Sequence, residues 1–180
     1  TMNEPLPGLI GCTDLAEPMG LFLLGDAPTP FQAMLLGAGM PHEVGVWKAS
    51  YTGFRRTGRR LVNPGGVSAW REGAEPIWRQ NGVWGLDAAG VARLLRPDHF
   101  ALVDGRPVHV TDDYVRPFVL RYVEAIRDVA PDALIFVEGV PSAQPPRWGS
   151  GDPPGVVHAG HWYDGATLFT KRYLPFLGVD

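Results

Sequence analysis

Apolar residues recur with a helical period between residues 115 and 129. They occupy positions i, i+3, i+4, i+7, i+8, i+11 and i+14, and they are Val115, Phe118, Val119, Tyr122, Val123, Ile126 and Val129. This spacing places them on one face of an amphipathic helix. Asp112 and Asp113 precede that helix, where negative charge and capping oxygens favour a helix start.

Two apolar runs of strand length follow the predicted helix. Ala133–Val137 is continuously apolar and ends in Glu138, which predicts a strand that is buried on both faces, as in a parallel sheet covered by helices. The run 156–160 ends in His161-Trp162-Tyr163-Asp164, and a short helix is predicted over 166–173. This order is typical of a βα-barrel, whose site forms from polar residues at the carboxyl ends of the strands.

The first 110 residues are rich in turn signals and predict shorter elements. A helix is expected around Phe31–Leu36, with Thr29 as its cap and Pro30 in its first turn. Residues 44–110 predict a long excursion of hairpins and loops within the same domain. Its β-like runs are Val44–Trp47, Arg60–Val62 and Val83–Leu86, and its turns are Asn63-Pro64-Gly65-Gly66, Asn81-Gly82 and Asp104-Gly105. Long loops of this kind are usually functional.

Charge and cysteine content narrow the function classes. The 180 residues carry a formal net charge of −3, which argues against a nucleic-acid partner because phosphate binding needs clustered Lys and Arg. The basic cluster 55–60 is expected to be a solvated hairpin or loop; the alternative is peripheral contact with a lipid surface. Cys12 is the single cysteine and cannot form an internal disulfide. No signal peptide or transmembrane segment is visible, so the localisation stays unassigned.

Glycine, proline and tryptophan predict ordered loops around a site. The chain has 23 Gly, 18 Pro and six Trp, and loops on a rigid scaffold commonly carry function. Four of the tryptophans fall in the 44–110 excursion, where we expect them to be exposed: Trp47, Trp70, Trp78 and Trp84.

Two carboxylates are candidates for glycoside cleavage, which needs one acid to protonate the leaving oxygen and a second carboxylate as nucleophile or base. Glu4 lies in Asn3-Glu4-Pro5, where Asn3 is placed to hydrogen-bond a sugar 2-hydroxyl. Glu138 stands at a strand end, and either acts as the nucleophile or orders the site. Asp26 and Asp152 lie beside Pro-rich loops and have no evident partner.

The strand end at 161–164 supplies the third candidate group. His161 is suited to bind a sugar hydroxyl, Trp162 to stack on a pyranose, and Tyr163 to hydrogen-bond a nucleophilic carboxylate; the alternative is a half-buried aromatic strand end. The five histidines show no metal-binding spacing, and neither a phosphate-binding Gly loop nor a Gly-x-Ser-x-Gly motif is present. No metal and no cofactor are expected.

In this order the motifs resemble glycoside hydrolase family 5, a family of retaining (β/α)₈ glycosidases. Asn3-Glu4-Pro5 looks like the end of strand four, Ala133–Glu138 like strand five, and 156–163 like strand six. Further segments are similar to the subgroup that hydrolyses glycolipids, which includes glucosylceramidase-like and steryl β-glucosidase-like enzymes. These segments are Gly8-Leu9-Ile10-Gly11, Leu61-Val62-Asn63, Ser68-Ala69-Trp70, Asn81-Gly82-Val83-Trp84 and Arg96-Pro97-Asp98.

The resemblance implies a role for several residues. Glu4 would be the acid/base and Asn3 the partner of the sugar 2-hydroxyl, while Tyr163 would support the nucleophile and His161 would line the sugar subsite. In the family the nucleophile ends strand seven, after the His-x-Tyr strand, so the resemblance does not make Glu138 the nucleophile. The implied fold is α/β: a partial (β/α)₈ TIM barrel of about strands four to six, with residues 1–180 in one catalytic domain.

The implied activity is hydrolysis of a glycoside or glycolipid, such as glucosylceramide or a steryl glucoside, by double displacement with two Glu. Two alternatives remain open. A complete small glycosidase would use Glu4 and Glu138 as its pair, and a non-catalytic module would bind a carbohydrate or lipid through its aromatic loops.

A full barrel takes roughly 250 residues, so we expect this chain to be an internal fragment whose partners include the remaining barrel segments of the same protein. The purified 180-residue chain should then be inactive on aryl β-glucosides, because it lacks the expected nucleophile. A release assay for the aryl group checks this, and full turnover by the isolated chain would contradict it.

Overall fold

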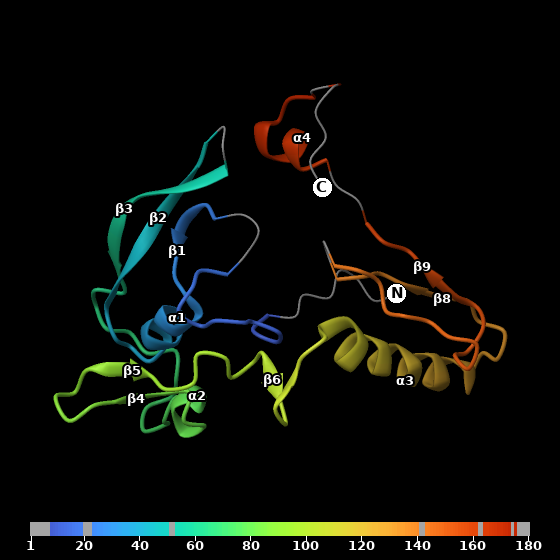
Figure 1. Ribbon diagram of the computed structural model, residues 1–180, viewed down its shortest axis with the longest axis horizontal. Coiled ribbons are helices and arrows are strands. Elements are labelled where there is room, and N and C mark those ends of the chain that lie inside the picture. Colours follow the sequence, from blue (N-terminus) through green and yellow to red (C-terminus); the bar gives the residue numbers. More distant parts are fainter. Residues whose placement is uncertain are drawn as a thin grey trace. The chain divides into compact units, whose positions relative to one another are not determined.

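A computed structural model describes residues 8–19, 23–50, 53–140, 143–161, 164–173 and 175 (Figure 1). The chain divides into two compact units, one formed by Gly11–Pro107 and the other by the residues up to Ile10 and from Val108 onward. The described part is α/β, with one three-stranded and three two-stranded sheets. Among these residues, no helix is both long and apolar enough to cross a membrane.

The helix predicted over 115–129 is present in the second unit. A π-helical turn, Thr111–Val115, leads directly into α3, Arg116–Arg127, and a proline stands in the first turn of α3. The carboxylate of Asp113 accepts a hydrogen bond of 2.8 Å from the backbone N–H of His109. This bond satisfies an amide group ahead of the helix, as a capping carboxylate does.

The apolar face of α3 packs against strand β8, Ile135–Val137. Its central members are almost fully buried, and the cluster consists of Val115, Val119, Val123, Ile135 and Val137. Two members of the predicted stripe are exposed, Phe118 at 46% and Val129 at 88%. Val129 lies beyond the last residue of α3, and the ring of Phe118 stacks on that of Tyr122.

The two predicted apolar strands form a parallel pair. β8 lies beside β9, Val156–His158, with Ile135 opposite Val156 and Val137 opposite His158. The backbone N–H of Ala159 donates to the carbonyl of Val137 at 2.9 Å, which extends the ladder one residue further. A parallel pair joined by a long connection is the arrangement that the sequence pattern predicts.

The expectation that β8 is buried on both faces was wrong for this chain. Phe136 is 45% exposed, and its parallel neighbour Val157 is 36% exposed. Side chains alternate along a strand, and α3 covers only the face of Ile135 and Val137. α3 therefore leaves the face that carries Phe136 uncovered.

The last helix, α4, is shorter than the predicted 166–173. It spans Gly165–Thr170, and the carboxylate of Asp164 caps it by accepting from the backbone N–H of Thr167 at 3.2 Å. Lys171 adopts a left-handed conformation (φ +54°), which ends the helix.

In the first unit, three antiparallel strands form a sheet in the order β1-β2-β3, and helix α1 contacts it. The strands are β1, Gly25–Ala27; β2, His42–Ser50; and β3, Gly53–Val62. α1, Pro30–Gly37, confirms the predicted helix and its cap: Thr29 and Gln32 exchange side-chain-to-backbone hydrogen bonds of 3.0 and 3.1 Å.

The rest of this unit consists of short hairpins, as the turn signals predicted. Helix α2, Ile77–Gln80, precedes the β4–β5 hairpin of Trp84–Leu86 and Ala92–Leu94. Asp104 and Gly105, both at positive φ, turn Leu102–Val103 (β6) back onto Arg106–Pro107 (β7).

Trp84 departs from the prediction of an exposed tryptophan. Its side chain is only 2% exposed and belongs to the core of the first unit. It begins β4, where Leu94 lies opposite, and the guanidinium of Arg79 lies 5.8 Å from its ring centroid. Trp47, Trp70 and Trp78 are half-buried.

The α3–β8 contact predicts a matched pair of effects on stability. Replacing Val119 with Ala removes two methyl groups from a site that is 1% exposed, and should lower the free energy of unfolding by about 2 kcal/mol. Val129→Ala makes the same chemical change at an exposed position and should have almost no effect. Denaturant unfolding measures both, and equal effects of the two variants would contradict this packing.

Candidate active site

Glu138 lies at the carboxyl end of β8, directly after Val137. It is the one charged side chain among the buried residues that the structure describes, with 8% of the residue exposed. Its parity along the strand matches that of Phe136, so it belongs to the face that α3 does not cover. A buried carboxylate needs a charged or hydrogen-bonding partner, because burial otherwise disfavours its ionised form.

His161, in the segment that follows the neighbouring strand, supplies such a partner. Its Nε2 lies 3.3 Å from Oε1 of Glu138, and its side chain remains 43% exposed. His161 follows β9 by three residues, so the parallel pairing brings both side chains to the same edge. The structure therefore joins two of the residues that the sequence nominated, through a contact that the sequence analysis did not predict.

Two glycines lie close to the imidazole of His158. A Cβ at Gly160 would lie 2.6 Å from Nε2 of His158, and a Cβ at Gly139 would lie 3.3 Å from Cε1 of the same ring. Contacts below 3.0 Å are not tolerated without a shift, so any larger residue at position 160 has to displace the His158 ring.

The remaining nominated residues, Asn3, Glu4, Trp162 and Tyr163, lie outside the described residues. Their roles stay predictions. In the described part of the chain, no group of three His, Cys, Asp or Glu side chains is placed to hold a metal ion.

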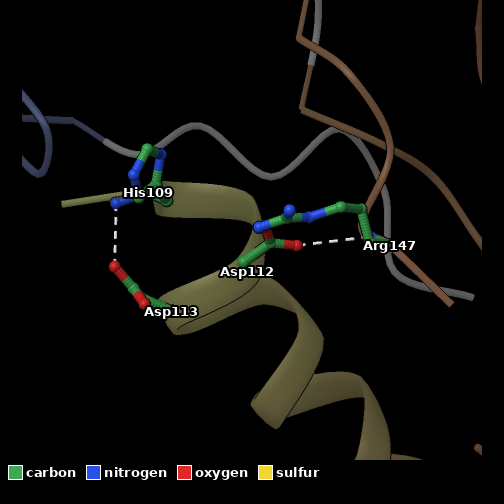
Figure 2. A network of polar contacts seen from close by, with 4 residues as sticks. All are labelled: His109, Asp112, Asp113 and Arg147. Carbon is green, nitrogen blue, oxygen red and sulfur yellow. Dashed lines mark hydrogen bonds and ion pairs between the residues drawn. The ribbon is translucent and has the colours of Figure 1, made fainter. Parts of the chain in front are cut away.

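The connection from β8 to β9 is fastened to the start of α3 (Figure 2). Arg147 donates from Nε and Nη2 to Oδ2 of Asp112, at 3.0 and 2.7 Å, and its backbone N–H donates to Oδ1 at 3.2 Å. Asp112 belongs to the π-helical turn that precedes α3. Three bonds to one carboxylate hold this connection more firmly than a single surface ion pair would.

Asp152 forms a second link, so the expectation that it has no partner was wrong. It pairs with Arg116, the first residue of α3, and its Oδ2 accepts from the backbone N–H of Gly149 at 2.7 Å. The same correction applies to Asp26, which pairs with Arg60. Sequence spacing gave no signal for these pairs, because their partners lie 36 and 34 residues away in the chain.

The carboxyl end of α3 is hydrogen-bonded to the segments that precede β8 and β9. Arg127 donates to the carbonyls of Ala133 and Pro154, at 3.3 and 2.6 Å. α3 therefore runs antiparallel to β8 and β9, and its first turn lies at the carboxyl ends of these strands. A hollow of about 530 Å³ lies beside the fastened connection, lined by Arg116, Arg147, Trp148, Gly149, Gly151 and Asp152.

Comparison with known proteins confirms the predicted resemblance to the glycolipid-cleaving subgroup. No family model matches the chain. The chain is 35% identical over 178 residues to a glucosylceramidase of Rhizopus delemar, covering 96% of this chain and 26% of that protein. It is 36% identical to a glucosylceramidase of Aspergillus fumigatus (100% and 27%) and 26% identical to the ergosteryl-beta-glucosidase of Saccharomyces cerevisiae (100% and 26%).

A solved structure matches as well. The crystal structure of Cryptococcus neoformans sterylglucosidase 1 with tris aligns with a TM-score of 0.88 and 31% sequence identity, covering 100% of this chain and 28% of that one. The chain thus spans about a quarter of the length of the relatives that it matches.

The Asp112–Arg147 link predicts a pH dependence. Hydrogen bonds from the side chain and backbone of Arg147, followed by its positive charge, hold the pKa of Asp112 below its ordinary value of 3.8. A lowered folded-state pKa stabilises the fold above pH 3.8, and this contribution is lost as the pH falls through the folded-state pKa. The unfolding temperature of the wild type should therefore fall more steeply below about pH 4 than that of Asp112→Asn.

Asp132→Asn is the matched control, since Asp132 is exposed and lies outside this link. It should preserve the acid dependence of the wild type. An unchanged pH profile in Asp112→Asn would show that the link does not form.

Proposed function

We propose that this chain forms part of a retaining β-glycosidase that hydrolyses glycolipids of the glucosylceramide or steryl glucoside type. The observation that carries the proposal is the alignment of the whole chain with a sterylglucosidase structure at 31% identity and a TM-score of 0.88. Curated relatives named glucosylceramidase and ergosteryl-beta-glucosidase support the same chemistry. Retention means two displacements on the anomeric carbon, with one Glu as nucleophile and another as acid and base.

The arrangement of α3, β8 and β9 supports the finer proposal that these elements belong to a (β/α)₈ barrel of family 5. In such a barrel one face of each strand packs against the outer helices, and the other faces the filled interior. Ile135 and Val137 contact α3, while Phe136 and Val157 lie on the uncovered face. Further strands of the same protein would cover that face, and residues 1–180 would then belong to one catalytic domain.

Glu138 and His161 support the placement of the site at the carboxyl ends of these strands. In our proposal Glu138 orients the imidazole of His161, which then binds a sugar hydroxyl. The 3.3 Å contact and the burial of Glu138 suit this positioning role. The active-site carboxylates would be Glu4, as acid and base, and a nucleophile supplied by a later strand.

The roles of Asn3, Trp162 and Tyr163 in this proposal follow from the family pattern. Asn3 would hold the sugar 2-hydroxyl, a contact that strengthens in the transition state. Trp162 would stack on the sugar ring, and Tyr163 would hydrogen-bond the nucleophile. No cofactor is needed, because both steps use only carboxylates and water.

Substitution of Glu4 in a longer protein that contains this chain tests the proposal. Glu4→Gln cannot protonate a sterol leaving group, so kcat on a steryl glucoside should fall by about 10²- to 10⁴-fold. The dinitrophenolate group of a dinitrophenyl glucoside leaves without being protonated. The first displacement should therefore remain fast, and a pre-steady-state burst should appear. Added azide should then accelerate turnover, because an anionic nucleophile needs no general base.

Glu138→Gln separates this proposal from the alternative in which Glu138 is the nucleophile. A positioning role predicts a loss of about 10²-fold or less, with the burst pattern of the wild type retained. Complete loss of the glycosyl-enzyme intermediate would instead favour the Glu4–Glu138 pair. Glu124→Gln, at an exposed position of α3, is the matched control and should leave the kinetics unchanged.

A further inference from the structure

Positive charge is concentrated on the β2–β3 hairpin. Residues 42–62 contain five Lys or Arg and one acidic residue, Glu43, which gives this segment a net charge of +4. The whole chain has 16 basic and 19 acidic residues, so the other residues together carry −7. The five cations are Lys48, Arg55, Arg56, Arg59 and Arg60. Such segregation creates a local positive potential on an acidic protein.

The outer part of this hairpin extends beyond the third strand. β1 pairs with β2 only from Gly45 to Trp47, so Lys48–Ser50 and Gly53–Arg55 form a two-stranded ribbon (Figure 1). Lys48 and Arg55 are exposed on this ribbon. Nearer the base, Arg59 pairs with Glu43 at 3.9 Å and Arg60 pairs with Asp26. Lys48, Arg55 and Arg56 form no ion pair with any residue in the described ranges.

The register of the ribbon sets like charges opposite each other. Lys48 lies directly across from Arg55, and like charges at such positions destabilise a hairpin. Partners across a ladder share a face, so Trp47 and Arg56 lie on one face with Ala49 and Phe54, and Lys48 and Arg55 on the other. The ribbon thus holds two cations side by side on one face, an arrangement that an anionic partner would relieve.

We propose that the outer β2–β3 ribbon docks this protein onto the surface of an anionic phospholipid bilayer. Basic residues bind the negative surface potential of such a bilayer. Lys48 and Arg55 lie together on one exposed face of the ribbon, so that face can lie against a flat anionic surface. Extended contact with a nucleic acid is disfavoured, since the residues outside the hairpin carry −7 and would repel a phosphate backbone.

This proposal does not depend on hydrolytic activity, and its test uses the purified 180-residue chain. Co-sedimentation with phosphatidylcholine vesicles, with and without phosphatidylserine, measures partitioning. The wild type should bind only the vesicles that contain phosphatidylserine, and raised salt should release it because exposed charges are screened. Each basic residue near the surface contributes roughly fivefold, so Lys48→Gln with Arg55→Gln should weaken binding by about 25-fold.

Thermal unfolding of the same double variant separates a binding role from a structural one. Removal of the like-charge pair should leave the unfolding temperature unchanged or raise it, while vesicle binding falls. The matched control is the double variant Arg71→Gln with Arg106→Gln. Both positions are exposed and lie outside the hairpin, so this variant should still bind the vesicles. Equal binding by the double variant and the wild type, equal binding to neutral vesicles, or binding to duplex DNA in place of vesicles would each overturn the proposal.

Discussion

The packing of α3 on β8 is the interaction on which the arrangement of the candidate site depends. Val119 and Val123 are 1% and 2% exposed against Ile135 and Val137, at 5% and 3%. This contact selects which face of β8 is covered, and the alternation of the strand then assigns Glu138 to the opposite face. The apolar contact is non-directional, so the position of the carboxylate follows from strand geometry rather than from any polar attraction.

Polar links at both ends of α3 fix the orientation of this helix relative to β8 and β9. Arg127 bonds the amino ends of the strands, while the links from Asp112 and Arg116 hold the connection between β8 and β9 at the other end. Hydrogen bonds between charged groups are stronger and more directional than neutral ones. They hold the long connection beside the start of α3, at the strand edge where Glu138 and His161 meet.

The two units differ in the surroundings of their charged side chains. In the unit that contains α3, the apolar core includes Val137, and the next residue is the buried Glu138 of the candidate site. In the Gly11–Pro107 unit, the β2–β3 hairpin exposes its cations and buries Val44.

The sequence alone determined the local elements: the amphipathic period of α3, the Thr29 cap of α1, the turn at Asp104 and Gly105, and the two apolar runs that form β8 and β9. These features depend on neighbours within a few residues, which a periodic pattern records. Only the tertiary structure decided that Trp84 is buried, that Phe136 is exposed, that Arg147 reaches Asp112 and that Glu138 meets His161. Each of these depends on residues that lie ten to several tens of positions apart, and nothing in the chain's local chemistry specifies which distant segments come together.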